Sequence, residues 1–457
     1  MTKKAKAHNK THPTNHRDIG IAGAFSIGIG GIIGGGIFAT LGLAGSQARG
    51  ATFLSFIVGG LVALLTAYSY VRLSLTFPGA GGTVTFLNRA FGNGRFAGGL
   101  NMLLVLSYVI IMALYAGAFA NYAGSFLPEP ARAAGQQLLA PGIIVLLAIV
   151  NLVGPALVQK SATLFNVGKL GILLIFVIVG MFSPALSFSR LGPASWVSPL
   201  EIVGSGMLVF LSYEGFELIA NASGHIRTPA TTLPIAYYGS ILFAIVLYVL
   251  IVIVVIGHLP FEALDAAQDR SVAVAAGTFM GKFGGVLLVV GAILATASAI
   301  NSDFFGAAKL PQILAEEKQM PNRYQREIWG RHPLALFMIA GLSILVIRYV
   351  DLHAISAAAS TGFLVVFAMV NAGNAKLAKQ TRSRGWLSLV AAAACFGALG
   401  VMIVQILGQP QHSRSLWLIG GVLTLPFVYE VVYSQIATRF VPGGAHSDDS
   451  VRTDQWK

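Results

Sequence analysis

The stretch GIGGIIGGGIFATLG, residues 28–42, lies in the first long apolar run of the chain, and seven of its fifteen residues are glycine. Glycine in a helix interior costs roughly 0.5–1 kcal/mol relative to alanine. Such glycines have three explanations: close packing of helices, a general preference for small residues, or an interrupted helix. Gly34-Gly35-Gly36 stands near the middle of the run, and three consecutive glycines exceed what close packing requires. The stretch therefore predicts a helix that is broken near its middle.

The composition is typical of a membrane protein. The chain has 457 residues, of which only 10% are charged, and its mean hydropathy is +0.75. Apolar runs of about 20 residues, enough to cross the hydrocarbon core of a bilayer, recur from end to end. Because lipid offers the backbone no hydrogen bonds, these runs form helices. We expect an all-α polytopic membrane protein with twelve spans, near residues 19–45, 51–76, 97–127, 138–157, 161–183, 200–222, 233–257, 283–308, 334–350, 354–373, 386–407 and 413–436.

The formal net charge of +13 raises the question of a nucleic-acid partner, but the charge follows membrane topology. Twelve spans place both termini on one side, and the loops there carry roughly three times as many lysine and arginine residues as the opposite loops. Positively charged loops stay in the cytoplasm. Residues 1–18 and 437–457 are therefore predicted to be cytoplasmic tails of a plasma (inner) membrane protein, with the lipid bilayer and no nucleic acid as its surroundings.

Metal and cofactor sites are not expected. His8, His12 and His16 recur every four residues, but Pro13 interrupts any helix there, so a solvated tail explains them better than a metal site. The single cysteine, Cys395, excludes an internal disulfide.

A broken helix offers two sets of unpaired backbone groups. The new N-terminus presents N–H groups and partial positive charge, which suit a carboxylate, and the other end presents carbonyl oxygens, which suit an ammonium group. Many transporters contain two inverted repeats, each with one interrupted helix. With five spans per repeat, the sixth span should also be broken. That span, EIVGSGMLVFLSYEGFELIANASGHIRTP, is interrupted by Tyr213-Glu214-Gly215-Phe216-Glu217, with two carboxylates at membrane depth.

Four motifs in order resemble those of the amino acid–polyamine–organocation (APC) superfamily of transporters. They are IGGGIF (33–38), FPGAGGTVTFLNRAFG (77–92), YEGFELIANASGHIRTPATTLPIA (213–236) and AEEKQMPNRY (315–324). The resemblance implies the LeuT-like fold, with residues 19–183 and 200–373 as inverted repeats of five spans and two additional spans within 386–436. It also implies alternating access to a site at the middle of the membrane.

The resemblance also implies which backbone groups bind an amino acid. The N–H groups for its carboxylate would be those of Gly34, Gly35 and Gly36. The carbonyls for its amine would be those of Ile32, Ile33, Phe210, Ser212 and Tyr213.

Two charged residues inside spans are candidates for coupling. Lys169 lies roughly 12 Å into the fifth span at 1.5 Å per residue, so either its side chain reaches the interface or its buried amine takes the place of a sodium ion, as in several APC members with a similar NVGKLG motif. Burial favours a neutral amine, which would allow proton exchange. Asp303 lies near the end of the eighth span and either pairs with Lys169 or belongs to a solvated helix end.

The residues expected to select the substrate lie at the second break, at Gly215. Glu214 has two explanations, a partner for a cationic side chain or second amine, and a structural acceptor for N–H groups freed by the break. Glu217 is expected to be structural. Phe210 and Phe216 border the break and are candidates for a gate. Tyr108 and Tyr115 either face the cavity or lie on a packed face, which is the commoner place for a tyrosine.

These features together predict a secondary active transporter of amino acids, sodium-independent and driven by protons or by exchange. The alternative that stays open is transport of polyamines or other organic cations. An enzyme is disfavoured because all nine histidines lie in tails, loops or span ends. A channel is disfavoured because channels have shorter pore elements repeated around an axis, whereas this chain shows one inverted repeat with an enclosed site.

Overall fold

The computed structural model describes residues 18–153, 155–327, 333–408 and 413–440. Most of the two predicted tails, with His8, His12 and His16, lies outside these residues. The helices at the expected spans are α1 (Ile21–Ile32) with α2 (Gly36–Ala48), α3 (Thr52–Thr76), α5 (Arg95–Gly124), α6 (Glu129–Val153), α7 (Pro155–Met181), α8 (Pro199–Leu208) with α9 (Leu218–Asn221), α10 (Pro229–His258), α12 (Ser271–Ala307), α14 (Pro333–Tyr349), α15 (Leu352–Lys376), α17 (Gly385–Leu407) and α18 (Ser413–Phe440).

Short elements occupy the connections between these helices. Within the described ranges they are α4 (Gly82–Phe91), α11 (Phe261–Ala267), α13 (Leu310–Glu316), α16 (Ala378–Thr381) and six 3₁₀ turns, which include η3 (Phe210–Tyr213) and η5 (Gln268–Arg270). The described residues form no β-strand, only two isolated bridges that pair Ile19 with Ile226 and Arg49 with Trp196.

The helices have the length and composition that a bilayer demands. Among the described residues, eight helices are long and apolar enough to cross a membrane, or ten if each of two bent pairs is one span. Two shorter apolar helices, Phe165–Met181 and Pro333–Tyr349, lie where the fifth and ninth spans are expected. The polytopic all-α architecture is thus confirmed, and the number of twelve spans stays a prediction.

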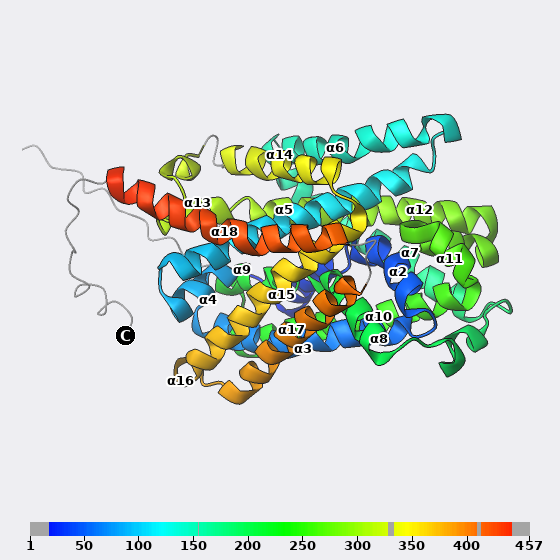
Figure 1. Ribbon diagram of the computed structural model, residues 1–457, viewed down its shortest axis with the longest axis horizontal. Helices are drawn as coiled ribbons and strands as arrows, with labels where there is room; N and C mark the ends of the chain where they lie inside the picture. The colour runs from blue at the N-terminus through cyan, green and yellow to red at the C-terminus, as the bar shows by residue number, and fades with distance from the viewer. Residues whose placement is uncertain (1–17, 154, 328–332, 409–412, 441–457) are drawn as a thin grey trace, which may run out of the picture.

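The long helices run side by side in one bundle (Figure 1). Figure 1 shows α6 and α14 together at its top and α3, α15 and α17 together at its lower side, while α18 crosses α5, against which it packs. Large apolar side chains cover the outside of these helices. Leu138, Phe283 and Trp417, for example, are 75%, 74% and 85% exposed. An outer surface of this kind suits lipid, because water would make such extended apolar exposure costly.

Local sequence explains where several helices begin or bend. Ser198 and Glu201 form a reciprocal capping box at the start of α8, with Pro199 in its first turn. The side chain of Asp351 accepts the Ala354 N–H and caps α15. In α12 the backbone at Gly281 has φ +65°, which kinks the helix two residues before the expected start of the eighth span.

Candidate substrate-binding site

The first helix break lies where the glycines predict it. α1 ends at Ile32, Ile33 has φ −83° and ψ 71°, and α2 begins at Gly36. The two helices are bent by 47° relative to each other. The first N–H groups of α2 and the last carbonyls of α1 therefore meet at Ile33-Gly34-Gly35, inside the bundle rather than at its surface.

The second break lies in the sixth span, as expected. α8 ends at Leu208, the chain passes through η3, and Glu214 is extended with ψ 153°. Gly215 has φ +107°, a conformation that side-chain-bearing residues rarely adopt, and the helix resumes at Leu218. The two halves of this span are bent by 49°.

The two breaks touch each other directly through glycine. A Cβ atom on Gly31 would lie 2.6 Å from the carbonyl oxygen of Gly215, and one on Gly36 would lie 2.7 Å from the Cα of Ser212. Across the same contact the hydroxyls of Thr40 and Ser212 are 2.9 Å apart. Since Thr40 also donates to the Gly36 carbonyl, Ser212 must be the donor to Thr40. Gly31 thus explains part of the glycine richness that the break alone does not require.

Neighbouring helices enclose the contact between the breaks. A Cβ on Gly34 would meet Ala299 of α12 at 2.8 Å, and one on Gly35 would meet the ring of Tyr115 of α5 at 2.7 Å. Tyr115 therefore packs against the first helix break, although a packed face away from the site was the favoured expectation for this residue. Phe210 and Phe216 are fully buried and both contact the ring of Phe367 in α15, so the two gate candidates belong to one aromatic cluster.

Tyr248 of α10 bridges the breaks and was missed by sequence reasoning. Its hydroxyl lies 2.8 Å from the carbonyl oxygen of Ile32 and 3.1 Å from that of Ser212, two of the oxygens predicted to bind an amine. A hydroxyl has one proton, so it serves one of the two carbonyls at a time. The signal that would have found it is its place as the lone polar side chain in the run ILFAIVLYVLIVIVVIG, residues 241–257.

The two glutamates of the second break have different roles in the structure. Glu217 accepts hydrogen bonds from the Gly215 N–H at 2.8 Å and from the Tyr108 hydroxyl at 2.7 Å, so it is the structural acceptor of the break. Tyr108 reaches the break as well, instead of only filling a packed face. Glu214 is only 2% exposed, and its Oε1 has no hydrogen-bond partner among the described atoms. The structural explanation offered for Glu214 therefore belongs to Glu217.

Lys169 is fully buried and does not reach the membrane interface. Its Nζ donates to the carbonyl oxygen of Gly30 at 3.3 Å, so it joins α7 to the last turn of α1 just before the first break. The expectation that the Lys169 side chain reaches the membrane interface is therefore wrong, because the side chain turns toward α1.

Both expectations for Asp303 are wrong. In the described part of the chain it makes no ion pair with Lys169, and with 3% exposure it is no solvated helix end. It lies one helical turn beyond Ala299, which contacts Gly34, and one turn before Gly306, whose Cβ would lie 2.9 Å from Leu218 of α9. This places Asp303 on the face of α12 that lies against the two breaks.

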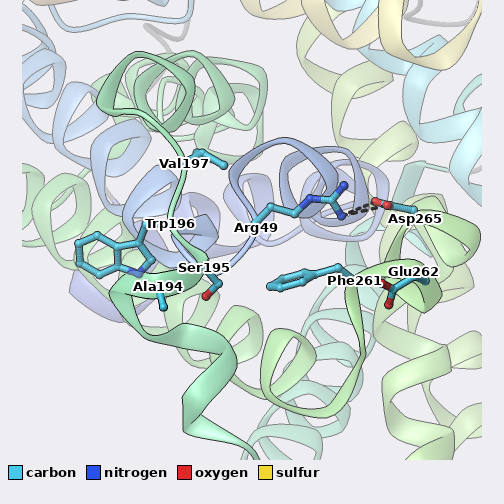
Figure 2. Close-up of a pocket in the computed structure, with 8 residues that line it drawn as sticks. All are labelled: Arg49, Ala194, Ser195, Trp196, Val197, Phe261, Glu262 and Asp265. Atoms are coloured by element: carbon cyan, nitrogen blue, oxygen red, sulfur yellow. Dashed lines mark hydrogen bonds and ion pairs between the residues drawn. The ribbon is translucent and has the colours of Figure 1, made fainter.

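A cavity of about 520 Å³ lies away from the breaks, at the end of α2 (Figure 2). It is lined by residues that include Arg49, Trp196, Phe261 and Asp265, and Arg49 bonds Asp265 at 2.9 Å with its guanidinium over the ring of Phe261. Arg49 is thirteen residues from Gly36 along α2, so this cavity is roughly 20 Å from the first break at 1.5 Å per residue. It is therefore distinct from the candidate site.

Contacts cover the breaks toward both ends of the bundle. At the end where α1 begins, the backbone of Ile19 exchanges hydrogen bonds with His225 and Arg227. At the end where α2 finishes, η5 lies so close to α2 that a Cβ on Gly42 would collide with the Gln268 carbonyl. The Tyr122 hydroxyl of α5 holds η5 through the carbonyl of Asp269.

Comparison with known proteins identifies the family. A family model described as amino acid permease matches residues 19–428. The chain belongs to the amino acid permease family. The matched region contains both helix breaks and Lys169, and it ends inside α18 of this permease. The resemblance to the APC superfamily is thereby confirmed.

Two of the relatives described here are named for different substrates, and a third is named only as a transport protein. The inner membrane transport protein YbaT of Escherichia coli (strain K12) is 31% identical over 417 residues, or 89% of this chain and 94% of YbaT. The methylthioribose transporter of Bacillus subtilis (strain 168) is 26% identical over 66% of this chain and 67% of its own length. The cationic amino acid transporter 9, chloroplastic, of Arabidopsis thaliana is 28% identical over 68% and 57%.

Proposed function

We propose that this permease is a secondary active transporter that carries amino acids across the plasma membrane by alternating access. The observation that carries the proposal is the direct contact of two broken helices at Gly31 and Gly215. It brings the N–H groups at the start of α2 into one enclosed place with the carbonyls of Ile32 and Ser212, which accept from the exchangeable hydroxyl of Tyr248. N–H groups and carbonyls together suit both charged ends of an amino acid.

The backbone groups have distinct parts in this proposal. The N–H groups of Gly34, Gly35 and Gly36 bind the substrate carboxylate, and the Gly34 N–H leaves the Ile32 carbonyl, to which it donates at 2.9 Å, when it does so. The carbonyls of Ile32 and Ser212, with those of Ile33, Phe210 and Tyr213, bind the substrate amine. An ammonium group has three donors, whereas the Tyr248 hydroxyl offers one proton to the same oxygens. Binding of the ammonium therefore displaces Tyr248 from at least one carbonyl.

Alternating access is supported by how the breaks are covered. Contacts of Ile19 with His225 and Arg227 lie on one side of the site, and the contact of η5 with α2 lies on the other. Opening either set while the other stays closed would expose the breaks to one side at a time. Residues 19–183 and 200–373 are the inverted repeats in this scheme, both termini are cytoplasmic, and the substrate leaves chemically unchanged.

Lys169 is the proposed coupling residue. Its amine bonds the Gly30 carbonyl one turn before the break and so holds α1 to α7, as a sodium ion bound there would. Transport is then independent of sodium and driven either by a proton that Lys169 exchanges or by counter-exchange of amino acids. Asp303, which faces the breaks, is the second coupling candidate.

Uptake of a labelled amino-acid panel into proteoliposomes tests this function, with and without an inward proton gradient and with and without sodium. Gradient-driven uptake that is lost in Lys169→Ala, with no effect of sodium, supports the proposal. The matched control is Lys282→Ala, since Lys282 is an exposed lysine of α12. Uptake only into vesicles preloaded with amino acid would assign exchange and return Lys169 to a structural role.

Transport of polyamines or other organic cations is the second candidate. The specific observation in its favour is the unbonded, buried Oε1 of Glu214 beside the second break. Putrescine in the same panel decides between the two, because it lacks the carboxylate that the N–H groups of α2 would bind. Uptake of putrescine and of no amino acid would replace the first proposal with this one.

A further inference from the structure

Three buried acidic side chains lie near one another beside the second helix break. Glu214, Glu217 and Asp303 are 2%, 2% and 3% exposed. The three carboxyl groups lie close enough to interact electrostatically, Glu214 with Glu217 and Asp303 with both. The cluster is thus formed by two residues of the sixth span and one of α12.

Two members of the cluster have an unused oxygen. Both oxygens of Glu217 accept hydrogen bonds, from the Gly215 N–H and from Tyr108. Glu214 Oε1 and Asp303 Oδ2, by contrast, have no partner among the described atoms. Two buried carboxyl groups thus keep acceptor capacity that the fold itself does not use.

In the part of the chain that the structure describes, no positive charge balances the cluster. Lys169 is committed to the Gly30 carbonyl, and among the described residues no lysine or arginine forms an ion pair with any of the three acids. The other titratable groups that interact with the cluster are the phenols of Tyr70, Tyr108, Tyr115 and Tyr237, and a phenol carries no charge at neutral pH. Buried like charges without a counter-charge are strongly unfavourable, so at least one of the carboxyl groups holds a proton in this state.

We propose that Glu214 and Asp303 form a site for one organic cation, the ammonium or guanidinium group at the far end of the transported molecule, and that this cation replaces a proton of the cluster. The inference rests on the proposed function, because the other end of the same molecule lies at the helix breaks. An organic cation suits the site better than a metal ion. Within the described residues, no three His, Cys, Asp or Glu side chains are grouped closely enough to hold a metal.

The exchange at the cluster is balanced in charge. The substrate cation enters with its own protons, one carboxyl group becomes a carboxylate, and the released proton goes to solvent. The ionised carboxylate and the cation then form a charge-assisted hydrogen bond in a buried site, where such bonds are strongest. Protons and the substrate cation compete for the cluster, so affinity for a cationic substrate rises with pH.

Calorimetric titration of the purified full-length protein in nanodiscs tests the proposal with L-lysine, L-norleucine and putrescine. Lysine and norleucine have side chains of similar length and differ chiefly in the terminal ammonium group. Titration in two buffers of different ionisation heat reports the protons released. We expect about one proton released per lysine, none per norleucine, and a lysine affinity that rises with pH.

Variants assign the effect to the cluster. Glu214→Gln and Asp303→Asn should each lower the affinity for lysine relative to the affinity for norleucine by about tenfold or more. Glu430→Gln is the matched control, because Glu430 of α18 is also a buried carboxyl group with an unbonded oxygen but lies outside the site. It should leave the preference unchanged.

The three ligands distinguish failure of the cation site from failure of the proposed function. Putrescine that binds more tightly than lysine, also with proton release, would support the cation site and assign a free diamine as its ligand. Norleucine binding equal to that of lysine, without proton release and without an effect of Glu214→Gln, would overturn the cation site and leave amino acid transport intact. Failure of every amino acid to bind or be transported would instead overturn the proposed function.

Discussion

The contact of Gly31 with Gly215 predicts that one added methyl group separates the two broken helices. In Gly31→Ala the new Cβ would lie 2.6 Å from the Gly215 carbonyl oxygen, and ordinary contact begins at 3.4 Å, so one backbone must retreat by about 0.8 Å. Neither backbone is a flexible side-chain end that can turn away. Overpacking of this kind costs about 1–3 kcal/mol of unfolding free energy. The displacement also moves the carbonyl of Ile32, the next residue, away from those of η3.

Thermal unfolding and proteoliposome uptake measured together check this prediction. We expect Gly31→Ala to unfold at a lower temperature and to lose most of its uptake, although no side chain of the candidate site has changed. Gly341→Ala in α14 is the matched control, because a Cβ there has open space and alanine in a helix stabilises by up to about 1 kcal/mol relative to glycine. Uptake and stability of Gly31→Ala equal to those of the control would refute the claim that the breaks meet at these glycines.

Two further substitutions follow from the contacts. Tyr248→Phe leaves the carbonyls of Ile32 and Ser212 without their common donor, so the unfolding free energy of the ligand-free protein should fall by about 1–3 kcal/mol. We expect added substrate to raise the melting temperature of this variant more than that of the unchanged protein. A smaller rise would instead make Tyr248 a direct ligand of the substrate. Asp265→Asn breaks the ion pair with Arg49. The side chains of Arg49 and Asp265 are 35% and 42% exposed, so the unfolding free energy should fall by no more than about 1 kcal/mol. That difference should vanish in 1 M salt, and its persistence there would show that Asp265 stabilises the protein by another means.

Sequence reasoning succeeded where the membrane itself imposes the rule. Lipid forces each apolar run into a helix, so the positions of the helices follow from length and composition. The breaks at Gly34 and Gly215 were predictable because glycine triplets and intramembrane carboxylates weaken a helix wherever they occur. Lys169 stood out for the same reason, as a charge that a bilayer tolerates only for a purpose.

The partners of these groups were decided by tertiary structure. Glu214 and Glu217 are three residues apart and chemically equivalent in the sequence, yet only Glu217 receives the Gly215 N–H and the Tyr108 hydroxyl. Asp303 faces the breaks instead of Lys169 because of the rotation of α12 about its own axis. Tyr248 lies 216 residues from Ile32 along the chain, so nothing local could have paired them.

The amino-acid order alone was therefore enough to predict a bundle of membrane helices, the two helices that are broken, and the charged residues that lie within spans. These are properties of single segments, and each segment meets the same lipid environment alone. The packing of helices decided that the breaks meet at Gly31 and Gly215, that Glu217 is satisfied, and that Glu214 keeps a free oxygen. Those outcomes depend on the rotation and depth of each helix against its neighbours, which no single segment specifies.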